Sequence, residues 1–106
     1  MKKIIGITQR VEHFNKYKEY RDCLDQSWSS VAEKLNYQLL PIPNNAFPKE
    51  IMSMFSLSGI ILSGGNSIST DQGNDLKDVS IQRDNFEREL IKLAISKQIP
   101  ILGVCR

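Results

Sequence analysis

The sequence holds few of the residues that build disulfide or metal frameworks. Its 106 residues include only two cysteines, Cys23 and Cys105, and one histidine, His13. The cysteines form no C-x-x-C pair, so neither a disulfide framework nor a clustered metal site is expected. This cysteine usage is typical of a cytoplasmic protein, and nothing in the sequence calls for a metal or a cofactor.

Long apolar runs and a one-sided charge are also missing. No apolar stretch approaches the ~20 residues of a membrane span, and the run that begins at Ile4 ends at Thr8, which is too early for a signal peptide. The net charge is only +2, and the 14 Lys and Arg residues are spread along the chain. Partners of the membrane and nucleic-acid classes are therefore not expected. A content of 41% hydrophobic and 25% charged residues is that of one ordinary globular domain.

Short apolar runs predict four strands. Two prolines interrupt the second run, which places that strand near a sheet edge. The third run is apolar throughout its middle, as in a strand buried on both faces. The predicted strands cover residues 3–8, 38–43, 58–63 and 99–104.

Helical spacing predicts two long helices and one short one. The first long helix, over 19–36, carries its apolar stripe at Leu24, Trp28, Val31 and Leu35, and Asn36 ends it. The short helix starts at Pro48 and runs to Phe55. The second long helix covers 81–97, with a core stripe at Phe86, Leu90, Leu93 and Ala94 that Ile91 and Ile95 widen.

Two polar segments, 9–18 and 64–80, are expected to be loops. The second is long for a compact domain, which often signals function.

Strands that alternate with helices predict an α/β fold, a doubly wound, flavodoxin-like parallel sheet with helices on both faces in three layers. Ligands bind such sheets at the carboxyl ends of the strands. This rule brings residues 8–10, 63–66 and 105–106 to one edge.

Cys105 follows the last predicted strand in the pattern Gly103-Val104-Cys105, the first half of a G-x-[SC]-x-G nucleophile elbow. The alternative is a buried strand cysteine, since free cysteines are often buried. A cysteine nucleophile needs an oxyanion hole, for which the backbone N–H of Arg106 is one candidate donor. Gly64-Gly65, on the same edge, suits the second donor, and a plain turn is the alternative.

A cysteine nucleophile also needs a base, and His13 is the only histidine. It falls in the predicted loop after the first strand, where a solvent-exposed histidine is the simpler interpretation. The chain therefore shows no convincing triad. Cys23, beside Leu24 on the predicted first helix, is interpreted as a packing residue. Arg21 and Asp22, at the start of that helix, could reach the site edge.

Over essentially its whole length the sequence resembles the N-terminal half of class I glutamine amidotransferase-like domains, in particular the gamma-glutamyl hydrolase (peptidase C26) branch. The combination of a glycine pair, R-D-x-x-E and G-V-C-R in this order is far more specific than any one piece. Residues 1–106 are thus expected to be the N-terminal part of one such domain, ending at the elbow. The stretches that carry the resemblance are 3–10, 21–28, 59–66, 83–87 and 100–106.

The resemblance implies that Cys105 attacks glutamine or a gamma-glutamyl amide, a small-molecule substrate, and forms a gamma-glutamyl thioester. Gly65 and the backbone of Arg106 would form the oxyanion hole. Arg83 and Glu87, one helical turn apart, would buttress the elbow or the substrate pocket, although a charge cluster at a helix N-terminus is the alternative. The residues implied to bind substrate or to support the site are Gln9, Arg10, Gly64, Asn66, Arg83, Asp84 and Glu87.

The chain departs from the family pattern because the family's catalytic His and Glu lie downstream of the elbow. We therefore expect a fragment, a cleavage product or a truncated form that is inactive alone and is completed by the rest of the enzyme or by a second chain carrying His and Glu. Its last strand should leave an apolar sheet edge exposed. The alternatives are a glutamine amidotransferase subunit that supplies ammonia to a synthase partner, and a non-catalytic α/β binding module.

Overall fold

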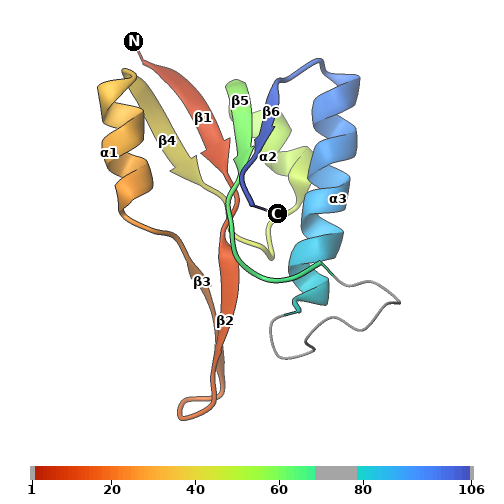
Figure 1. Cartoon of the computed structure of the whole chain (residues 1–106). Coiled ribbons are helices and arrows are strands. Elements are labelled where there is room, and N and C mark those ends of the chain that lie inside the picture. The colour runs from red at the N-terminus through yellow and green to blue at the C-terminus, as the bar shows by residue number, and fades with distance from the viewer. Residues whose placement is uncertain (1, 69–78, 106) are drawn as a thin grey trace.

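A parallel sheet forms the centre of the protein (Figure 1). The computed structural model describes residues 2–68 and 79–105. The sheet has the strand order β4-β1-β5-β6, and each neighbouring pair is parallel. The predicted α/β fold with a parallel sheet is confirmed, as is the position of the proline-containing strand at an edge. The strands are β1 Lys3–Ile7, β4 Tyr37–Pro41, β5 Leu57–Leu62 and β6 Ile101–Gly103.

Helices cover both faces of this sheet. Helices α2 (Pro48–Met54) and α3 (Ile81–Ser96) lie on one face, and α1 (Ser27–Lys34) lies on the other (Figure 1). Alternate side chains of a strand point to opposite faces. The core between the sheet and helices α2 and α3 contains Ile60, Leu62, Phe86, Leu90 and Ala94, together with Ile42, Met52 and Leu57.

Helix ends follow the expected local signals. Pro48 begins α2, where its missing N–H has no helical partner to lose. The Ser80 side chain accepts a hydrogen bond from the Arg83 backbone N–H and caps α3. Asn36, with φ 61°, ends α1 in the left-handed conformation that asparagine tolerates. The predictions for α2 and α3 are therefore confirmed within a few residues.

The region before α1 differs from the prediction. Instead of a loop over 9–18 and a helix from 19, strands β2 (Arg10–Phe14) and β3 (Glu19–Cys23) form an antiparallel hairpin. The hairpin projects away from the main sheet (Figure 1). Its residues carry no apolar alternation because neither face packs against the core, and period-2 alternation is the signal that reveals a strand. Cys23 accordingly lies on β3 and not on a helix.

The predicted apolar stripes are only partly correct. In α1 the buried residue is Ala32, whereas Val31 and Leu35 are 44% and 62% exposed and Leu24 precedes the helix. In α3, Phe86, Leu90 and Ala94 are buried four residues apart, as predicted. Ile95 is 66% exposed, because one residue further along a helix turns the side chain about 100° from Ala94.

The sheet edge next to β6 is apolar and open among the described residues. Leu102 is 57% exposed, and a Cβ on Gly103 would meet no heavy atom within 4 Å. Within the described residues, no helix has the length and apolarity needed to cross a bilayer. The predicted loop over 64–80 is described at residues 64–68, 79 and 80, where Ser67 and Val79 form a bridge; its residues 69–78 lie outside the described residues.

Candidate active site

The structure brings the carboxyl ends of β1, β5 and β6 together, as the sequence predicted. Thr8 donates from its backbone N–H to Ile61, and Val104 donates to Leu62. A Cβ on Gly64 would lie 3.5 Å from the Cβ of Cys105. The glycine pair and the cysteine are therefore neighbours in space although they lie far apart in sequence.

Cys105 has an unusual backbone conformation. Its φ is 57°, in the left-handed region that non-glycine residues seldom adopt. The side chain is exposed and the thiol is free. The alternative of a buried strand cysteine is therefore wrong. A strained residue at the end of a parallel strand is the geometry that lifts a nucleophile above a sheet.

Gly65 occupies a position that requires glycine. Its φ is +102°, and a Cβ placed on it would lie 3.0 Å from Nε of Arg10. The loop can therefore pass close beneath the Arg10 side chain only because Gly65 has no side chain. The other predicted oxyanion donor, the backbone N–H of Arg106, lies outside the described residues.

Arg83 is fully buried and ties helix α3 to this loop. Its guanidinium donates to the carbonyl oxygens of Ser63 and of Gly65, the latter at 2.6 Å. It also pairs with Glu87, with 2.5 Å between Nε and Oε2. A solvated charge cluster at a helix N-terminus is thus the wrong interpretation for these two residues. Asp84, in the same turn, lines a surface pocket with Leu62.

Thr8 and Ser63 complete the support beneath the loop; the sequence placed both residues at this edge but predicted no role for them. The Ser63 hydroxyl donates to the Thr8 carbonyl at 2.7 Å, and the Ser63 backbone N–H donates to the Thr8 hydroxyl at 3.2 Å. Both residues are buried. A β-branched residue at a strand end gives no signal of such a role, since threonine is common in strands.

Asn66 connects the loop to the hairpin. Its Oδ1 accepts from the Val11 backbone N–H at 2.8 Å, and its Nδ2 donates to the Val11 carbonyl at 3.1 Å. Its φ of 55° is one that asparagine tolerates better than most residues. Asn66 is thus a structural link, in addition to its predicted place beside the glycine pair.

A second polar cluster lies at the neighbouring strand end. Asp22 accepts from the backbone N–H and from Nδ2 of Asn44, at 3.0 and 2.8 Å. The Nδ2 of Asn44 also donates to the Gln9 carbonyl, and the Gln9 side chain donates to Ile42. Asp22 therefore reaches the site edge from β3 rather than from a helix start, and Arg21 lies over the Phe14 ring. Asn44 is buried and was missed in the sequence, and its Oδ1 has no hydrogen-bond partner among residues 2–68 and 79–105.

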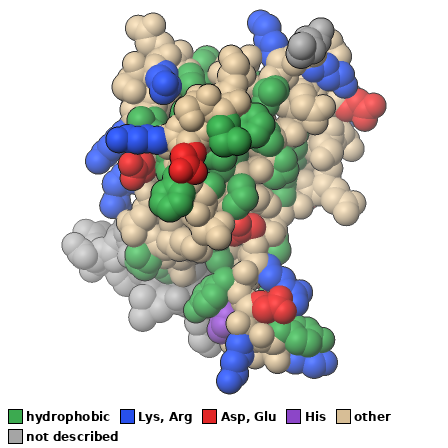
Figure 2. Space-filling view, turned by 180° about the vertical axis from the view of Figure 1, so that it is seen from behind, with side chains coloured by type: hydrophobic (Ala, Val, Ile, Leu, Met, Phe, Trp, Pro, Cys, Tyr) green, Lys and Arg blue, Asp and Glu red, His purple; other side chains and the backbone are tan. Residues whose placement is uncertain are grey.

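His13 is not brought to Cys105 by any contact within the described residues. It lies on β2, exposed, with its ring stacked on Tyr20 at 4.5 Å between centroids. Figure 2 shows this histidine on the projecting hairpin. Cys23 is half-buried, with its Sγ 3.9 Å from the Arg21 carbonyl oxygen. The described part of the chain holds no cluster of three His, Cys, Asp or Glu side chains suited to a metal ion.

The comparisons with known proteins decide the family. The profile of the Peptidase C26 family matches residues 3–106. The chain belongs to the Peptidase C26 family. The resemblance to part of a class I glutamine amidotransferase-like domain is thereby confirmed.

Two curated relatives of this family member have functional names. A gamma-glutamyl-CDP-amidate hydrolase of Campylobacter jejuni is 35% identical over 103 residues, which are 96% of this chain and 50% of that protein. A putative glutamine amidotransferase of Schizosaccharomyces pombe is 42% identical over 57 residues, 48% of this chain and 22% of that protein. The chain thus spans half or less of the length of these relatives.

Proposed function

We propose that this chain carries the nucleophile of a cysteine hydrolase that acts on glutamine or a gamma-glutamyl amide. The observation that carries the proposal is Cys105: an exposed thiol, in a left-handed conformation, against Gly64 at the carboxyl edge of the sheet. Residues 1–106 would be the N-terminal part of a single domain. Two unpaired cysteines also suit a reducing cytoplasm.

In the proposed reaction the Cys105 thiolate attacks the γ-carbonyl carbon of the substrate. A C–S bond forms, and the carbonyl oxygen becomes negatively charged. This oxygen accepts hydrogen bonds from the backbone N–H groups of Gly65 and Arg106. The C–N bond then breaks, and the amine leaves after it takes a proton from a general acid. Water hydrolyses the gamma-glutamyl thioester, which returns the thiol and releases glutamate.

The general acid and base would come from outside these residues. His13, the one histidine of the chain, is stacked on Tyr20 of the hairpin. We therefore propose that a His and a Glu are supplied by the remainder of the same enzyme or by a second chain. This also explains the expectation that the 106-residue chain alone has no turnover.

The Arg83–Glu87 pair supports the proposal through the glycine loop. An arginine that bonds the carbonyls of Ser63 and Gly65 fixes the Ser63–Gly64 and Gly65–Asn66 peptide planes, which flank the Gly64–Gly65 peptide. Preorganised donors are worth more in catalysis than donors that must reorient. In this account Gly64, Asn66, Gln9 and Arg10 shape the loop and its surroundings. Asp84, in the first turn of α3, would support the substrate pocket.

The substrate class follows the better-covered relative. The Campylobacter jejuni protein is named as a hydrolase of gamma-glutamyl-CDP-amidate. A gamma-glutamyl group joined to a larger amine is accordingly preferred over free glutamine. The second candidate, ammonia supply to a synthase partner, is favoured by the name of the Schizosaccharomyces pombe relative.

Turnover by the protein as its native source produces it tests the proposal. Glutamate release from gamma-glutamyl amides should be lost in Cys105→Ser and retained in Cys23→Ser, which alters the other free thiol. Dependence of release on an added synthase would favour the amidotransferase alternative. Unchanged activity of Cys105→Ser would overturn the proposed nucleophile, and no activity with any gamma-glutamyl compound would favour the binding module.

A further inference from the structure

The Arg10 side chain lies against the glycine pair that also contacts Cys105. A Cβ built on Gly65 would lie 3.0 Å from Nε and 3.1 Å from both Cβ and Cζ of Arg10. On the other residue of the pair, a Cβ built on Gly64 would lie 3.5 Å from the Cβ of Cys105. The two glycines therefore separate an exposed thiol from a guanidinium whose side chain is 44% exposed.

Two sets of contacts hold Arg10 in this position. Glu12, two residues further along β2, places its Oε1 2.7 Å from the Nε of Arg10. Asn66 bonds both the backbone N–H and the carbonyl of Val11, which lies between these two residues. The strand that carries the arginine is thereby fixed to the residue after Gly65. An exposed ion pair adds little to stability, so the importance of Glu12 lies in the orientation that it gives to Arg10.

The ion pair leaves the outer end of the guanidinium available. An arginine has five N–H donors in a planar fork, and Glu12 takes the one at Nε. Among residues 2–68 and 79–105, neither Nη atom of Arg10 has a hydrogen-bond or ion-pair partner. Two parallel N–H groups of a guanidinium match the two oxygens of a carboxylate. Arg10 therefore offers a bidentate carboxylate site close to the thiol.

The separation between Cys105 and Arg10 suits a gamma-glutamyl group. The glycine contacts place the Cys105 Cβ and the Arg10 Cζ at most about 13 Å apart, because neighbouring Cα atoms are about 3.8 Å apart. An extended gamma-glutamyl group on the sulfur carries its α-carboxylate carbon about 8 Å from the cysteine Cβ. A bidentate contact adds about 4 Å to the guanidinium carbon. One glutamyl group can therefore reach both residues.

We propose that Arg10 binds the α-carboxylate of the gamma-glutamyl group while Cys105 attacks its γ-carbonyl carbon, and that Glu12 positions the Arg10 guanidinium for this contact. The inference rests on the proposed function for the identity of the reacting bond. Arg10 would thus select substrates by the end of the glutamyl group that does not react. Because the contact is the same before and during the reaction, it lowers KM and leaves kcat nearly unchanged.

Steady-state kinetics of the whole protein with three amides of one amine tests the proposal. The gamma-glutamyl amide carries the whole head group, the 4-aminobutyryl amide lacks the α-carboxylate, and the glutaryl amide lacks the α-amino group. Arg10→Ala should raise KM about tenfold or more for the two amides that carry the carboxylate, since hydrogen bonds to charged groups are strong. KM for the 4-aminobutyryl amide, or its inhibition constant if it is not hydrolysed, should stay that of the parent.

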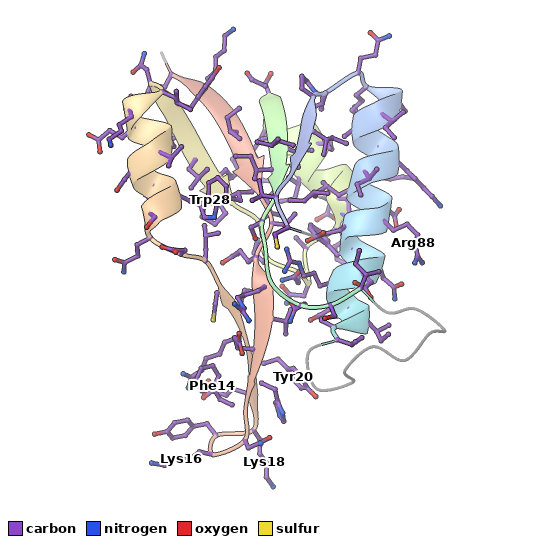
Figure 3. The ribbon with its side chains drawn as sticks, viewed as in Figure 1. Phe14, Lys16, Lys18, Tyr20, Trp28 and Arg88 are labelled. Carbon is purple, nitrogen blue, oxygen red and sulfur yellow. The ribbon has the colours of Figure 1, made fainter. Side chains whose placement is uncertain are left out.

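Arg21→Ala is the matched control on the same hairpin. Arg21 lies directly opposite Glu12, is 40% exposed and pairs with Glu19 at 3.1 Å. Its guanidinium lies over the ring of Phe14, 4.1 Å from the centroid, and Figure 3 shows this ring on the part of the hairpin that projects from the sheet. The variant removes the same charge as Arg10→Ala and should leave KM for all three amides unchanged.

Glu12→Ala separates a positioning role from a general one. Without its partner the Arg10 guanidinium is free to turn, so KM should rise for the two amides that carry the carboxylate, by less than in Arg10→Ala. KM for the 4-aminobutyryl amide should not change. An equal rise for all three amides would contradict a role of Glu12 through Arg10.

The same measurements contain the results that would overturn the proposal. An equal rise in KM for all three amides in Arg10→Ala would show an effect on the glycine pair rather than on the carboxylate. An equal rise in Arg21→Ala would reveal a general effect of charge. An unchanged KM for the gamma-glutamyl amide in Arg10→Ala would place the carboxylate elsewhere.

Failure of the proposed function gives a different pattern. Hydrolysis that persists in Cys105→Ser rejects the nucleophile, and the selective effect of Arg10→Ala on KM is still measured. If no amide is hydrolysed, titration calorimetry of the gamma-glutamyl amide with Cys105→Ser, with and without Arg10→Ala, gives the answer. Weaker binding with Arg10→Ala would support the carboxylate site, whereas equal affinity, or no binding to either protein, would reject it.

Discussion

Arg83 and Glu87 form an ion pair inside the protein, one turn apart on α3, with side chains that are 0% and 5% exposed. The same guanidinium bonds the carbonyls of Ser63 and Gly65. The N-terminal turn of α3 and the glycine loop are therefore one hydrogen-bonded unit. A buried pair of this kind is weak evidence of a stability role, so its value lies in what it positions.

Substitution of Arg83 should damage both stability and reactivity. Arg83→Ala leaves the Glu87 carboxylate buried without its partner, and we expect a loss of about 3–5 kcal/mol in the free energy of unfolding. Arg83→Lys keeps the charge but cannot bridge Glu87 and two carbonyls at once. We expect it to unfold at lower denaturant concentration and to slow the alkylation of Cys105.

The matched control is Arg88→Lys on the same helix. Arg88 is exposed and points away from the sheet (Figure 3), so its replacement should change stability by less than about 0.5 kcal/mol. If the Arg83→Lys and Arg88→Lys variants have the same denaturant midpoint and the same Cys105 reactivity, the buried arginine does not position the loop.

Gly65→Ala tests the close approach of the loop to Arg10. With φ +102° and a Cβ 3.0 Å from Arg10 Nε, we expect a loss of about 1–3 kcal/mol in urea unfolding and a displaced loop. Gly103→Ala is the control, because its Cβ would meet no heavy atom of the described residues within 4 Å, and it should change stability by less than about 1 kcal/mol. Similar losses in the two variants would contradict the account.

Asn66→Gly should loosen the hairpin while it keeps the backbone freedom that φ 55° needs. Without the two bonds to Val11, amide hydrogen exchange in β2 and β3 should accelerate about tenfold or more. Exchange in β1 and β5 should change far less. Asn45→Gly, in the exposed turn beside Asn44, is the control, and equal acceleration in that variant would rule out a specific anchor.

The amount of structure that the sequence predicts depends on burial. The runs at 58–63 and 99–104 predicted β5 and β6 because buried parallel strands are nearly continuous apolar runs. The hairpin was missed because the apolar residues of β2 and β3 do not alternate regularly with polar ones, so its pairing gives no period-2 signal. Because residues 19–23 belong to β3, α1 begins at Ser27 and not at residue 19 as predicted.

The candidate site was predicted only as far as topology allows. The rule for strand ends placed Gly64 and Gly65 near Cys105, and the structure brings them together. The buried state of Arg83 could not be predicted, because an arginine in the first turn of a helix normally points to solvent. Asn44 was missed for a similar reason, since an asparagine that follows Pro43 is typical of an exposed turn.

Asp25 should make the stability of the protein pH-dependent. Its carboxylate accepts the Ser27 backbone N–H at 2.8 Å. This bond, and then the Ser27 hydroxyl, lower the pKa of Asp25 from its ordinary 3.8. Because the pKa of Asp25 is lower in the folded state than in the unfolded state, the ionised carboxylate stabilises the fold. This stabilisation is complete above pH 3.8 and is lost as the pH falls through the lowered pKa.

Thermal unfolding of Asp25→Ala at two pH values checks this contribution. The variant should melt below the parent at neutral pH, and the two should converge well below pH 3.8. Gln26→Ala, at the adjacent exposed position, should show a difference that does not vary with pH. A difference in melting temperature between Asp25→Ala and the parent that is equally large in acid would contradict the proposed role of the charge.

The reactivity of the two thiols tests the central claim most directly. The protein from its native source is treated with a glutamine-mimicking electrophile, and the labelling rates of Cys105 and Cys23 are measured by mass spectrometry of their peptides. The account predicts that Cys105 is labelled much faster and that a gamma-glutamyl amide protects it. Equal rates at the two cysteines, or no protection by any gamma-glutamyl compound, would contradict the assignment of Cys105 as the nucleophile.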